Sequence, residues 1–366
     1  MFLYFSILFI PSIFYITNFK IDKNFQNFLL FCFCIFLILF IGLRHNSGGD
    51  WGNTVIDFYK NSDRFDFNRI SFRGDYLYEL ISYLNFIYFK NFYFFTSFWA
   101  IIFIFSLYIF LKNYNQVFLG FLISIPYLIT VVAMGFFRQG GALSLCIIGL
   151  NFLIKKKYLF FYFFIFLAIL VHKSSILFLF LPLIVSNDIK KILLNIILVS
   201  ILVLFLLLFI KDDLIRLYFY YAGDGKYLVS DGAFFRSLIN VVPAILFLLL
   251  RKKIKLIFPI EYKIFYPFAL IQLSLIYLSF NFSTLVDRMG IYAAPFHLFV
   301  FVNLHCFFNK KFKNLINIII LFYFNFYYFL WLSYGTFTAA WFPYKNIIIE
   351  YFINFPVIWP ARTMPF

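Results

Sequence analysis

Residues 158–185 read YLFFYFFIFLAILVHKSSILFLFLPLIV, an apolar run longer than the roughly 20 residues that cross a bilayer. Lysines flank it on both sides, at Lys155–Lys157 and at Lys190–Lys191. Basic loops of membrane proteins lie on the cytoplasmic side, so one straight span cannot connect two of them. A polar cluster, His172–Ser175, stands in the middle of the run. The pattern predicts a broken hairpin at 158–186, with two short helices of about 21 Å that meet near the outer surface.

The rest of the chain has the same apolar character. Hydrophobic residues make up 64% of the sequence and charged residues 13%, which is about half the charged share of an average soluble domain. Apolar runs alternate with short polar stretches, and no hydrophilic stretch is long enough to form a soluble domain. We therefore expect residues 1–366 to form a single transmembrane domain, an all-α polytopic bundle of about 11–13 transmembrane helices. The first apolar run, 2–17, lacks a basic segment and a cleavage site, so we interpret it as a helix rather than a signal peptide.

The distribution of basic residues assigns the two sides of the membrane. One set of loops contains 16 Lys or Arg and three acids, so the positive-inside rule makes these loops cytoplasmic. The remaining 15 basic and 12 acidic residues lie on the outer side and nearly balance. Nine of those 15 cations are Arg, whereas 15 of the 16 inner cations are Lys. Because arginine binds carboxylate and phosphate groups through forked donors, we expect anion recognition on the outer side.

Two outer stretches are long enough to contribute to a site. Residues 44–91 have the pattern of a glycine-rich turn followed by amphipathic, partly embedded helices. Residues 211–236 contain four Asp with GDG and DG turns, and the GDG lacks the spacing of a nucleotide-binding loop. Near the end of the chain, Trp341, Pro343 and Tyr344 fit either an aromatic belt at the membrane interface or a surface on which a sugar stacks.

Charged residues at membrane depth are candidates for function, because a charge near the bilayer centre costs several kcal/mol. Arg44 and Asp50 flank the glycine turn in RHNSGGD (44–50), where backbone N–H groups can approach an anion. Arg44 is a candidate phosphate ligand, and Asp50 is a candidate general base. The alternative for Arg44 is an interfacial residue that reaches the lipid head groups.

Two further pairs come from apolar segments. Arg138 and Gln139 stand at the outer end of a predicted span in GFFRQGG (135–141), where the helix dipole and the guanidinium together favour an anionic ligand. His172 and Lys173 form an ionisable pair inside the long apolar run. Histidine exchanges a proton near neutral pH, so His172 is a candidate general base or phosphate ligand. The alternative is a structural histidine with satisfied hydrogen bonds.

Asp287 and Arg288 interrupt an otherwise uncharged stretch, either as a ligand-binding pair or as an ion pair that neutralises itself. Arg73 and Asp75 either face the same cavity as the other candidates or lie on an interfacial helix. His297 and His305 are expected to be satisfied within the bundle.

The four cysteines lie inside apolar runs, without His or carboxylate groups at metal-ligand spacing. We therefore expect neither a disulfide framework nor a metal site. No cofactor is indicated by the sequence, and no nucleic acid partner is expected.

Five segments resemble, in their order, the EpsG branch of bacterial polysaccharide polymerases, the Wzy-type enzymes. They are GLRHNSGGDWGNTVIDFY (42–59), MGFFRQGGALS (134–144), LVHKSSILF (170–178), DRMGIY (287–292) and WFPY (341–344). The resemblance implies a multi-pass glycosyltransferase of the bacterial inner membrane with GT-C-like architecture. Such an enzyme joins oligosaccharide repeat units carried on undecaprenyl pyrophosphate, on the periplasmic side, with the growing chain as donor. The residues that match by position are Arg44, Asp50, Arg138, Gln139, His172, Lys173 and Arg288.

The resemblance also implies the partners: lipid-linked glycans, membrane lipid and, as a further candidate, a chain-length regulator. Elementary chemistry agrees with this function. A lipid pyrophosphate gains negative charge as it leaves, and fixed arginines stabilise that charge without a metal. The acceptor hydroxyl needs a base, for which we favour His172 over Asp50. Direct displacement inverts the anomeric configuration.

Two other functions remain open from the sequence. A transporter of polysaccharide or lipid-linked oligosaccharide needs cations along its whole path or paired halves, whereas these cations gather on the outer side. A membrane O-acyltransferase also uses a histidine, but its site must be reachable by a cytosolic acyl donor, and His172 maps to the outer side.

Overall fold

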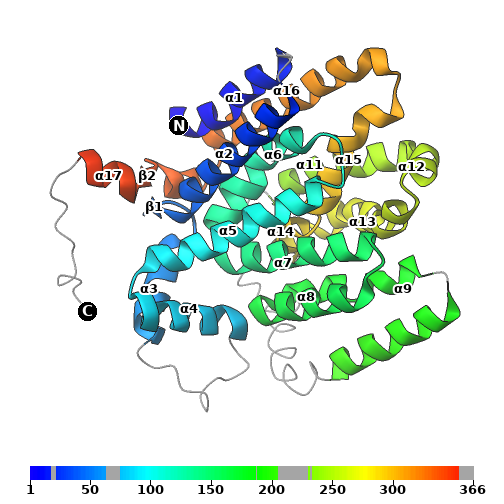
Figure 1. Ribbon diagram of the computed structural model, residues 1–366, viewed down its shortest axis with the longest axis horizontal. Coiled ribbons are helices and arrows are strands. Elements are labelled where there is room, and N and C mark those ends of the chain that lie inside the picture. Colours follow the sequence, from blue (N-terminus) through cyan, green and yellow to red (C-terminus); the bar gives the residue numbers. More distant parts are fainter. Residues whose placement is uncertain (18–21, 63–74, 187, 205–229, 231–232, 354–366) are drawn as a thin grey trace.

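The computed structural model describes residues 1–17, 22–62, 75–186, 188–204, 230 and 233–353. In these residues the secondary structure is helical except for two strands of two residues each, so the predicted all-α fold is confirmed (Figure 1). The strands, β1 (Arg44–His45) and β2 (Lys345–Asn346), pair antiparallel with Arg44 opposite Asn346. Sequence analysis did not predict this pairing, because two-residue strands have no periodicity to recognise.

The helices of the first part of the chain lead up to the broken hairpin. They are α1 (Phe2–Ile16), α2 (Lys23–Gly42), α3 (Trp51–Ser62), α4 (Tyr76–Phe89), α5 (Phe92–Leu111), α6 (Val117–Ser124), the π-helix η1 (Ile125–Ala133), α7 (Phe137–Ile154) and α8 (Tyr158–Val171). Capping side chains fix two of their starts. Asp22 accepts a hydrogen bond from the backbone N–H of Asn24 at 3.1 Å, and Asn91 accepts one from that of Tyr93 at 2.8 Å.

The second part of the chain contains more short and bent elements. They are the 3₁₀-helix η2 (Lys173–Phe178), α9 (Leu181–Val185), α11 (Ala233–Leu249), α12 (Arg251–Ile257), α13 (Pro259–Leu278), α14 (Ser283–Ile291), α15 (Ala294–Asn303), η3 (Leu304–Phe307), η4 (Lys310–Phe312), α16 (Lys313–Tyr334), η5 (Thr338–Trp341) and α17 (Ile347–Ile353). Residues 189–204 are also helical.

Among the described residues, four helices are long and apolar enough to cross a membrane: α2, α5, α7 and α16. A fifth span results if α14 and the helical segment Ala294–Phe307, which are bent by 53° at their junction, are counted together. Five further apolar helices are shorter, with 10–17 residues. The expected number of about 11–13 spans refers to the whole chain and includes shorter apolar helices, such as the arms of the broken hairpin, whereas the four or five spans are those of full length among the described residues. The chain is a multi-pass membrane protein.

The broken hairpin predicted at 158–186 is present. Helix α8 ends at Val171, and His172 has an extended backbone with φ −160° and ψ 124°. The first arm has 14 residues as expected, but the second consists of η2 followed by the short α9. Pro182 lies in the first turn of α9, where its missing N–H and fixed φ suit a helix start.

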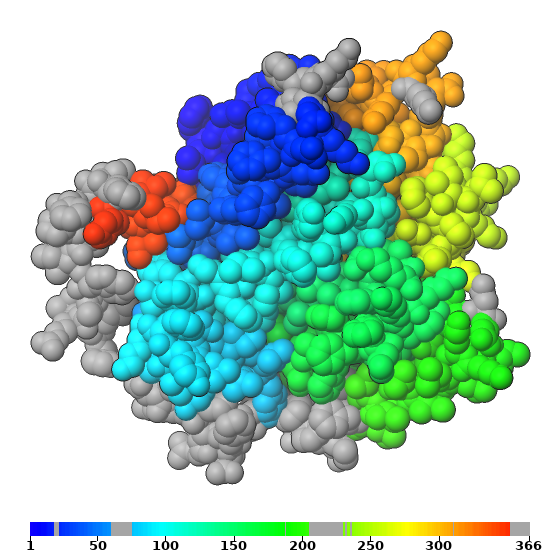
Figure 2. All heavy atoms as spheres, in the orientation of Figure 1, coloured from blue at the N-terminus to red at the C-terminus, as the bar shows by residue number. Residues whose placement is uncertain are grey.

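The surface of the bundle carries many large apolar side chains, as a lipid-facing surface does. Phe2 on α1, Phe31 on α2 and Phe322 on α16 are among the most exposed. Strands β1 and β2 and helix α17 lie at one end of the bundle, and the lysine-rich α12 lies at the opposite end (Figure 1). This separation agrees with the two sides assigned from the basic residues. Side chains of α5 and α8 lie on the face of the molecule shown in Figure 2.

Helix α7 is the centre of the core and packs against α5 and α8. Gly141 permits the close approach of α5, since a Cβ at this position would lie 2.8 Å from the ring of Trp99. Small residues have this role at many helix contacts in membranes. The close packing holds the outer end of α7, which begins at Phe137, in a fixed position.

The glycine turn at 44–50 packs against the C-terminal WFPY segment. The backbone N–H of Gly48 donates to the carbonyl of Ala340 at 2.9 Å, and the indole of Trp341 donates to the carbonyl of Thr130 at 2.8 Å. Tyr4 donates to the carbonyl of Trp341 at 3.1 Å. Trp341 is buried, so neither of the roles predicted for it, interface belt or sugar platform, is correct. It is a core residue that connects four distant parts of the chain.

Gly48 provides a direct test of this packing. Its φ is +113°, and a Cβ would lie 2.1 Å from the carbonyl oxygen of Met134. We expect Gly48→Ala to destabilise the protein by about 3 kcal/mol or more, through backbone strain and this clash. Gly52→Ala is the matched control, because no atom lies within 4 Å of its Cβ position. Thermal unfolding in detergent measures both variants, and a Gly48→Ala protein with the wild-type transition would contradict the packing described.

Candidate active site

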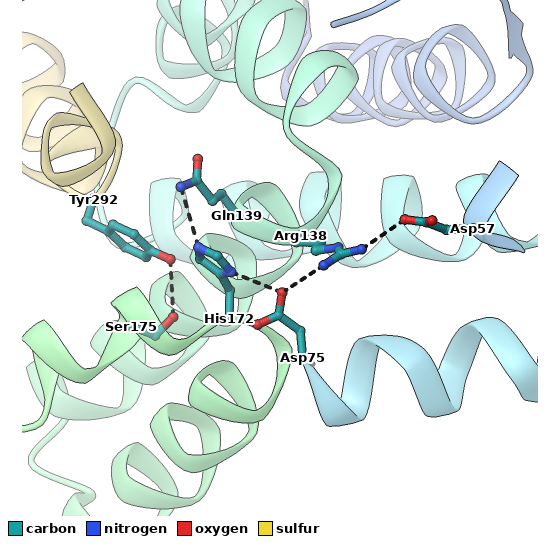
Figure 3. A network of polar contacts seen from close by, with 7 residues as sticks. All are labelled: Asp57, Asp75, Arg138, Gln139, His172, Ser175 and Tyr292. Atoms are coloured by element: carbon teal, nitrogen blue, oxygen red, sulfur yellow. Dashed lines mark hydrogen bonds and ion pairs between the residues drawn. The ribbon is translucent and has the colours of Figure 1, made fainter. Parts of the chain in front are cut away.

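Four ionisable side chains from four segments meet beside the break in the hairpin (Figure 3). His172 Nδ1 lies 3.2 Å from Asp75 Oδ2. The same carboxylate oxygen lies 3.6 Å from an NH1 nitrogen of Arg138, whose NH2 donates to Asp57 Oδ2 at 3.0 Å. These contacts connect α3, the start of α4, the start of α7 and the end of α8.

Local structure explains how each group reaches the cluster. Asp75 is the residue immediately before α4, and Arg138 is in the first turn of α7, so both lie at helix N-termini. His172 projects from the extended residue between α8 and η2. Asp57 lies in the middle of α3. A side chain in the middle of a straight span faces lipid or the protein core. At a helix end or a helix break, a side chain can instead face a polar site.

The contact with Asp75 orients the imidazole of His172. A carboxylate accepts hydrogen bonds, so it favours the tautomer of His172 with hydrogen on Nδ1, leaving Nε2 as an acceptor. Nε2 faces the side-chain nitrogen of Gln139 at 3.5 Å, a long contact. Asp75 is buried, and the His172 side chain retains 19% exposure. The imidazole is therefore oriented by Asp75 and remains partly exposed.

Arg138 retains donors for a ligand. Arginine has five N–H donors, and the carboxylates of Asp57 and Asp75 engage two of its nitrogens. The guanidinium carbon also lies 5.4 Å from the ring centre of Tyr78. Side-chain exposures of 41% for Arg138 and 47% for Asp57 place their ion pair in contact with solvent, where such a pair contributes little stability. An anion can therefore compete with Asp57 for this guanidinium.

Asp50 lies close to the same cluster. Its backbone N–H donates to the carbonyl of Gly135 at 3.1 Å, three residues before Arg138. Burial raises the pKa of the Asp50 carboxyl, and the charges of Arg138 and Arg288, with that of protonated His172, oppose this rise. The structure thus brings both base candidates into one region.

Arg44 has a different environment from the one expected of a phosphate ligand. It is fully buried, and its guanidinium donates to the backbone carbonyls of Ile41, Ser47 (3.0 Å) and Met134 (2.8 Å). The guanidinium also lies over the ring of Phe137, 4.3 Å from its centre. Burial lowers the pKa of Arg44 to about 10, which leaves it charged at neutral pH. With its donors on carbonyls and no exposed surface, Arg44 stabilises the glycine turn instead of facing a ligand.

Asp287 and Arg288 do not form the self-neutralising pair considered from the sequence. Asp287 Oδ1 forms an ion pair with Arg236 on α11, and its Oδ2 accepts a hydrogen bond from Ser230 at 3.1 Å. Arg288 acts electrostatically on Asp50. The two neighbours on α14 therefore face different groups.

Of the other site residues predicted from the sequence, two lie at or beside His172 and one lies outside the described residues. Gln139 is buried beside His172, and Lys173 is half-buried at the start of η2. Arg73 lies outside the described residues, as does most of the stretch 211–236. Ser175 and Tyr292 form a hydroxyl contact of 3.4 Å that joins η2 to the end of α14 (Figure 3).

Asp57 is not among the residues predicted from the sequence. It lies seven residues after Asp50, which places both on nearly the same face of an amphipathic helix. That spacing is the signal that could have identified it. Asp57 and Asp50 together surround Arg138 with carboxylates from the outer stretch 44–91.

Among the described residues, no three His, Cys, Asp or Glu side chains come close enough to hold a metal ion. The expectation that the site works without a metal remains a prediction, which is tested below.

A comparison with protein families identifies the family of the chain. The EpsG family matches the chain over residues 27–346, a range that contains every segment of the cluster. The chain belongs to the EpsG family. No curated protein and no solved structure matches it. EpsG-family proteins are polysaccharide-polymerase-like membrane proteins, so the chain is a membrane protein of polysaccharide biosynthesis. GT-C-like architecture remains a prediction.

Proposed function

We propose that this EpsG-family protein is a glycosyltransferase that polymerises oligosaccharide repeat units carried on undecaprenyl pyrophosphate. The reaction takes place on the periplasmic side of the bacterial inner membrane. The observation that supports it best is the cluster of His172, Asp75 and Arg138, which combines an oriented base with a cation that retains free donors. Polymerisation needs both functions at one place.

In this mechanism His172 is the general base. Its Nε2 accepts the proton of an acceptor hydroxyl, while Asp75 holds the Nδ1–H and stabilises the positive charge that develops on the ring. The acceptor oxygen forms a bond to the anomeric carbon, and the bond from that carbon to the pyrophosphate oxygen breaks. Attack opposite the leaving group inverts the anomeric configuration.

The leaving undecaprenyl pyrophosphate takes the electron pair of the broken bond and gains negative charge. Arg138 offers forked donors at the helix N-terminus of α7, and Arg288 adds a second positive charge nearby. Lys173, beside His172, is a further cation for the pyrophosphate. Fixed charges of this kind stabilise a transition state more than they stabilise the bound substrate.

The experiment that tests the proposed function uses the purified protein in lipid nanodiscs, with lipid-linked repeat units from the producing strain. We expect a ladder of polymers separated by one repeat unit. Monomeric lipid-linked glycan that stays unchanged in the presence of the protein would contradict the proposal.

Metal independence is tested in the same assay. We expect full activity in excess EDTA, because arginines and not a metal ion offset the charge of the leaving group. The control is a polymerisation reaction with added Mg²⁺, which should run at the same rate. Loss of activity with chelator, restored by Mg²⁺ or Mn²⁺, would show that acidic residues of the outer side hold a catalytic metal.

A further inference from the structure

A second polar site lies inside the bundle, in a cavity of about 50 Å³ between η1, α11, α15 and α16. Six of its lining residues can contact a polar ligand: Tyr127, Arg236, Asn240, His297, Tyr323 and Tyr327. The remaining lining side chains are apolar. A cavity with this composition is typical of a site for a small ligand that has both polar edges and an apolar face.

The cavity is connected to the candidate active site through α14. Arg236 lines the cavity and forms an ion pair with Asp287. The next residue along α14 is Arg288, whose charge acts on Asp50. The ion-pair partner of the cavity's arginine and a cation that acts on the candidate active site are therefore consecutive residues of α14.

The charges in the cavity favour a neutral ligand over a phosphate. Arg236 is compensated by Asp287 and also donates to Ser230 Oγ at 2.7 Å. A phosphate needs a cation whose charge and donors are left for it. The other polar groups that line the cavity are hydroxyl, amide and imidazole groups without formal charge at neutral pH.

One buried group of the cavity lacks a hydrogen-bond partner in the described part of the chain. It is the Nε2 atom of His297, so the expectation that this histidine is satisfied is wrong. Tyr127, Tyr323 and Tyr327, which line the same cavity, are half-buried. Buried polar groups are normally paired, so a ligand or water that supplies a hydrogen-bonding group to this nitrogen is the expected occupant.

We propose that this cavity is a subsite for one neutral sugar residue of the lipid-linked glycan, bound edge-on through its hydroxyl groups. The proposal rests on the proposed function. The cavity volume suits one edge of a single sugar and not an oligosaccharide, so the subsite selects one residue of the repeat unit. Stacking of Tyr323 on Phe301, with ring centres 5.8 Å apart, holds one aromatic wall in place.

Photo-crosslinking at adjacent positions of α16 tests the subsite. p-Benzoylphenylalanine replaces Tyr327, which lines the cavity, or Phe326, whose side chain is 52% exposed on the outside of the bundle. Each protein also carries His172→Ala, so that the lipid-linked repeat unit stays unreacted. We expect a glycan-bearing adduct at 327 with at least about tenfold more label than at 326. Equal labelling at both positions, or none at 327, would overturn the proposal.

A kinetic measurement avoids the bulky label. We expect Asn240→Ala to raise KM for the lipid-linked repeat unit about fivefold with kcat unchanged, the effect of losing one neutral hydrogen bond. Tyr327→Phe, which removes a hydroxyl alone, should act in the same direction. Unchanged KM in both variants would show that the cavity holds water only. If the wild-type protein itself makes no polymer, the proposed function fails, and the subsite fails with it.

Discussion

Replacing His172 with alanine or glutamine is expected to lower the rate of polymer formation about 10³-fold while the protein still folds and binds the lipid-linked substrate. A positioned general base contributes this much because the acceptor hydroxyl is a weak nucleophile until its proton is removed. Asp75→Asn should also lower the rate strongly, since the amide can donate to Nδ1 and so select the wrong tautomer, and it stabilises the developing positive charge poorly. The rate of polymer formation by purified variants measures both effects.

A control variant separates loss of the base from a general effect of replacing a histidine. His45→Gln is a matched control on the same side, because His45 contacts Tyr93 and not the cluster. Normal polymerisation by both His172 variants, together with an inactive Asp50→Asn protein, would assign the base to Asp50.

Replacing Arg138 with lysine is expected to lower kcat by about 10²-fold or more, although the charge is retained. Asp57 and Asp75 contact different nitrogens of the planar guanidinium, and lysine, with all its donors on one nitrogen, cannot reproduce this fork while also binding a pyrophosphate oxygen bidentately. The effect should appear in kcat more than in KM if Arg138 acts mainly on the leaving group.

Arg251→Lys is the control for this exchange. Arg251 is exposed on the lysine-rich α12 at the other end of the bundle, so its variant should polymerise at the wild-type rate. Wild-type kcat in Arg138→Lys would show that charge alone is needed at this position, and would exclude forked recognition of the pyrophosphate.

The break at His172 could be predicted from sequence because two independent signals coincide there. Lysines on both sides of one long apolar run require the chain to return, and the polar cluster marks where it does so. Helix α8 ends within one residue of that position. The form of the second arm could not be predicted, since a 3₁₀-helix and a short α-helix have the same apolar composition.

The role of Arg44 could not be read from the sequence for a different reason. One of its acceptors, the carbonyl of Met134, is 90 residues away, and every residue type supplies such a carbonyl. Trp341 illustrates the same limit, because its partner is the backbone of Thr130. From the sequence alone, a motif residue that stabilises a turn cannot be distinguished from one that contacts a ligand. The hydrogen-bond acceptors of its side chain in the structure distinguish the two.

The most direct test of the central claim counts two products of one reaction. Purified wild-type protein in nanodiscs receives lipid-linked repeat units as its sole substrate, and both new glycosidic linkages and released undecaprenyl pyrophosphate are measured over time. Polymerisation by this protein predicts one undecaprenyl pyrophosphate for each linkage formed, and neither product above background from His172→Ala. Lipid-linked units that cross the bilayer without any new linkage, or linkages formed equally well by the His172→Ala protein, would contradict the account.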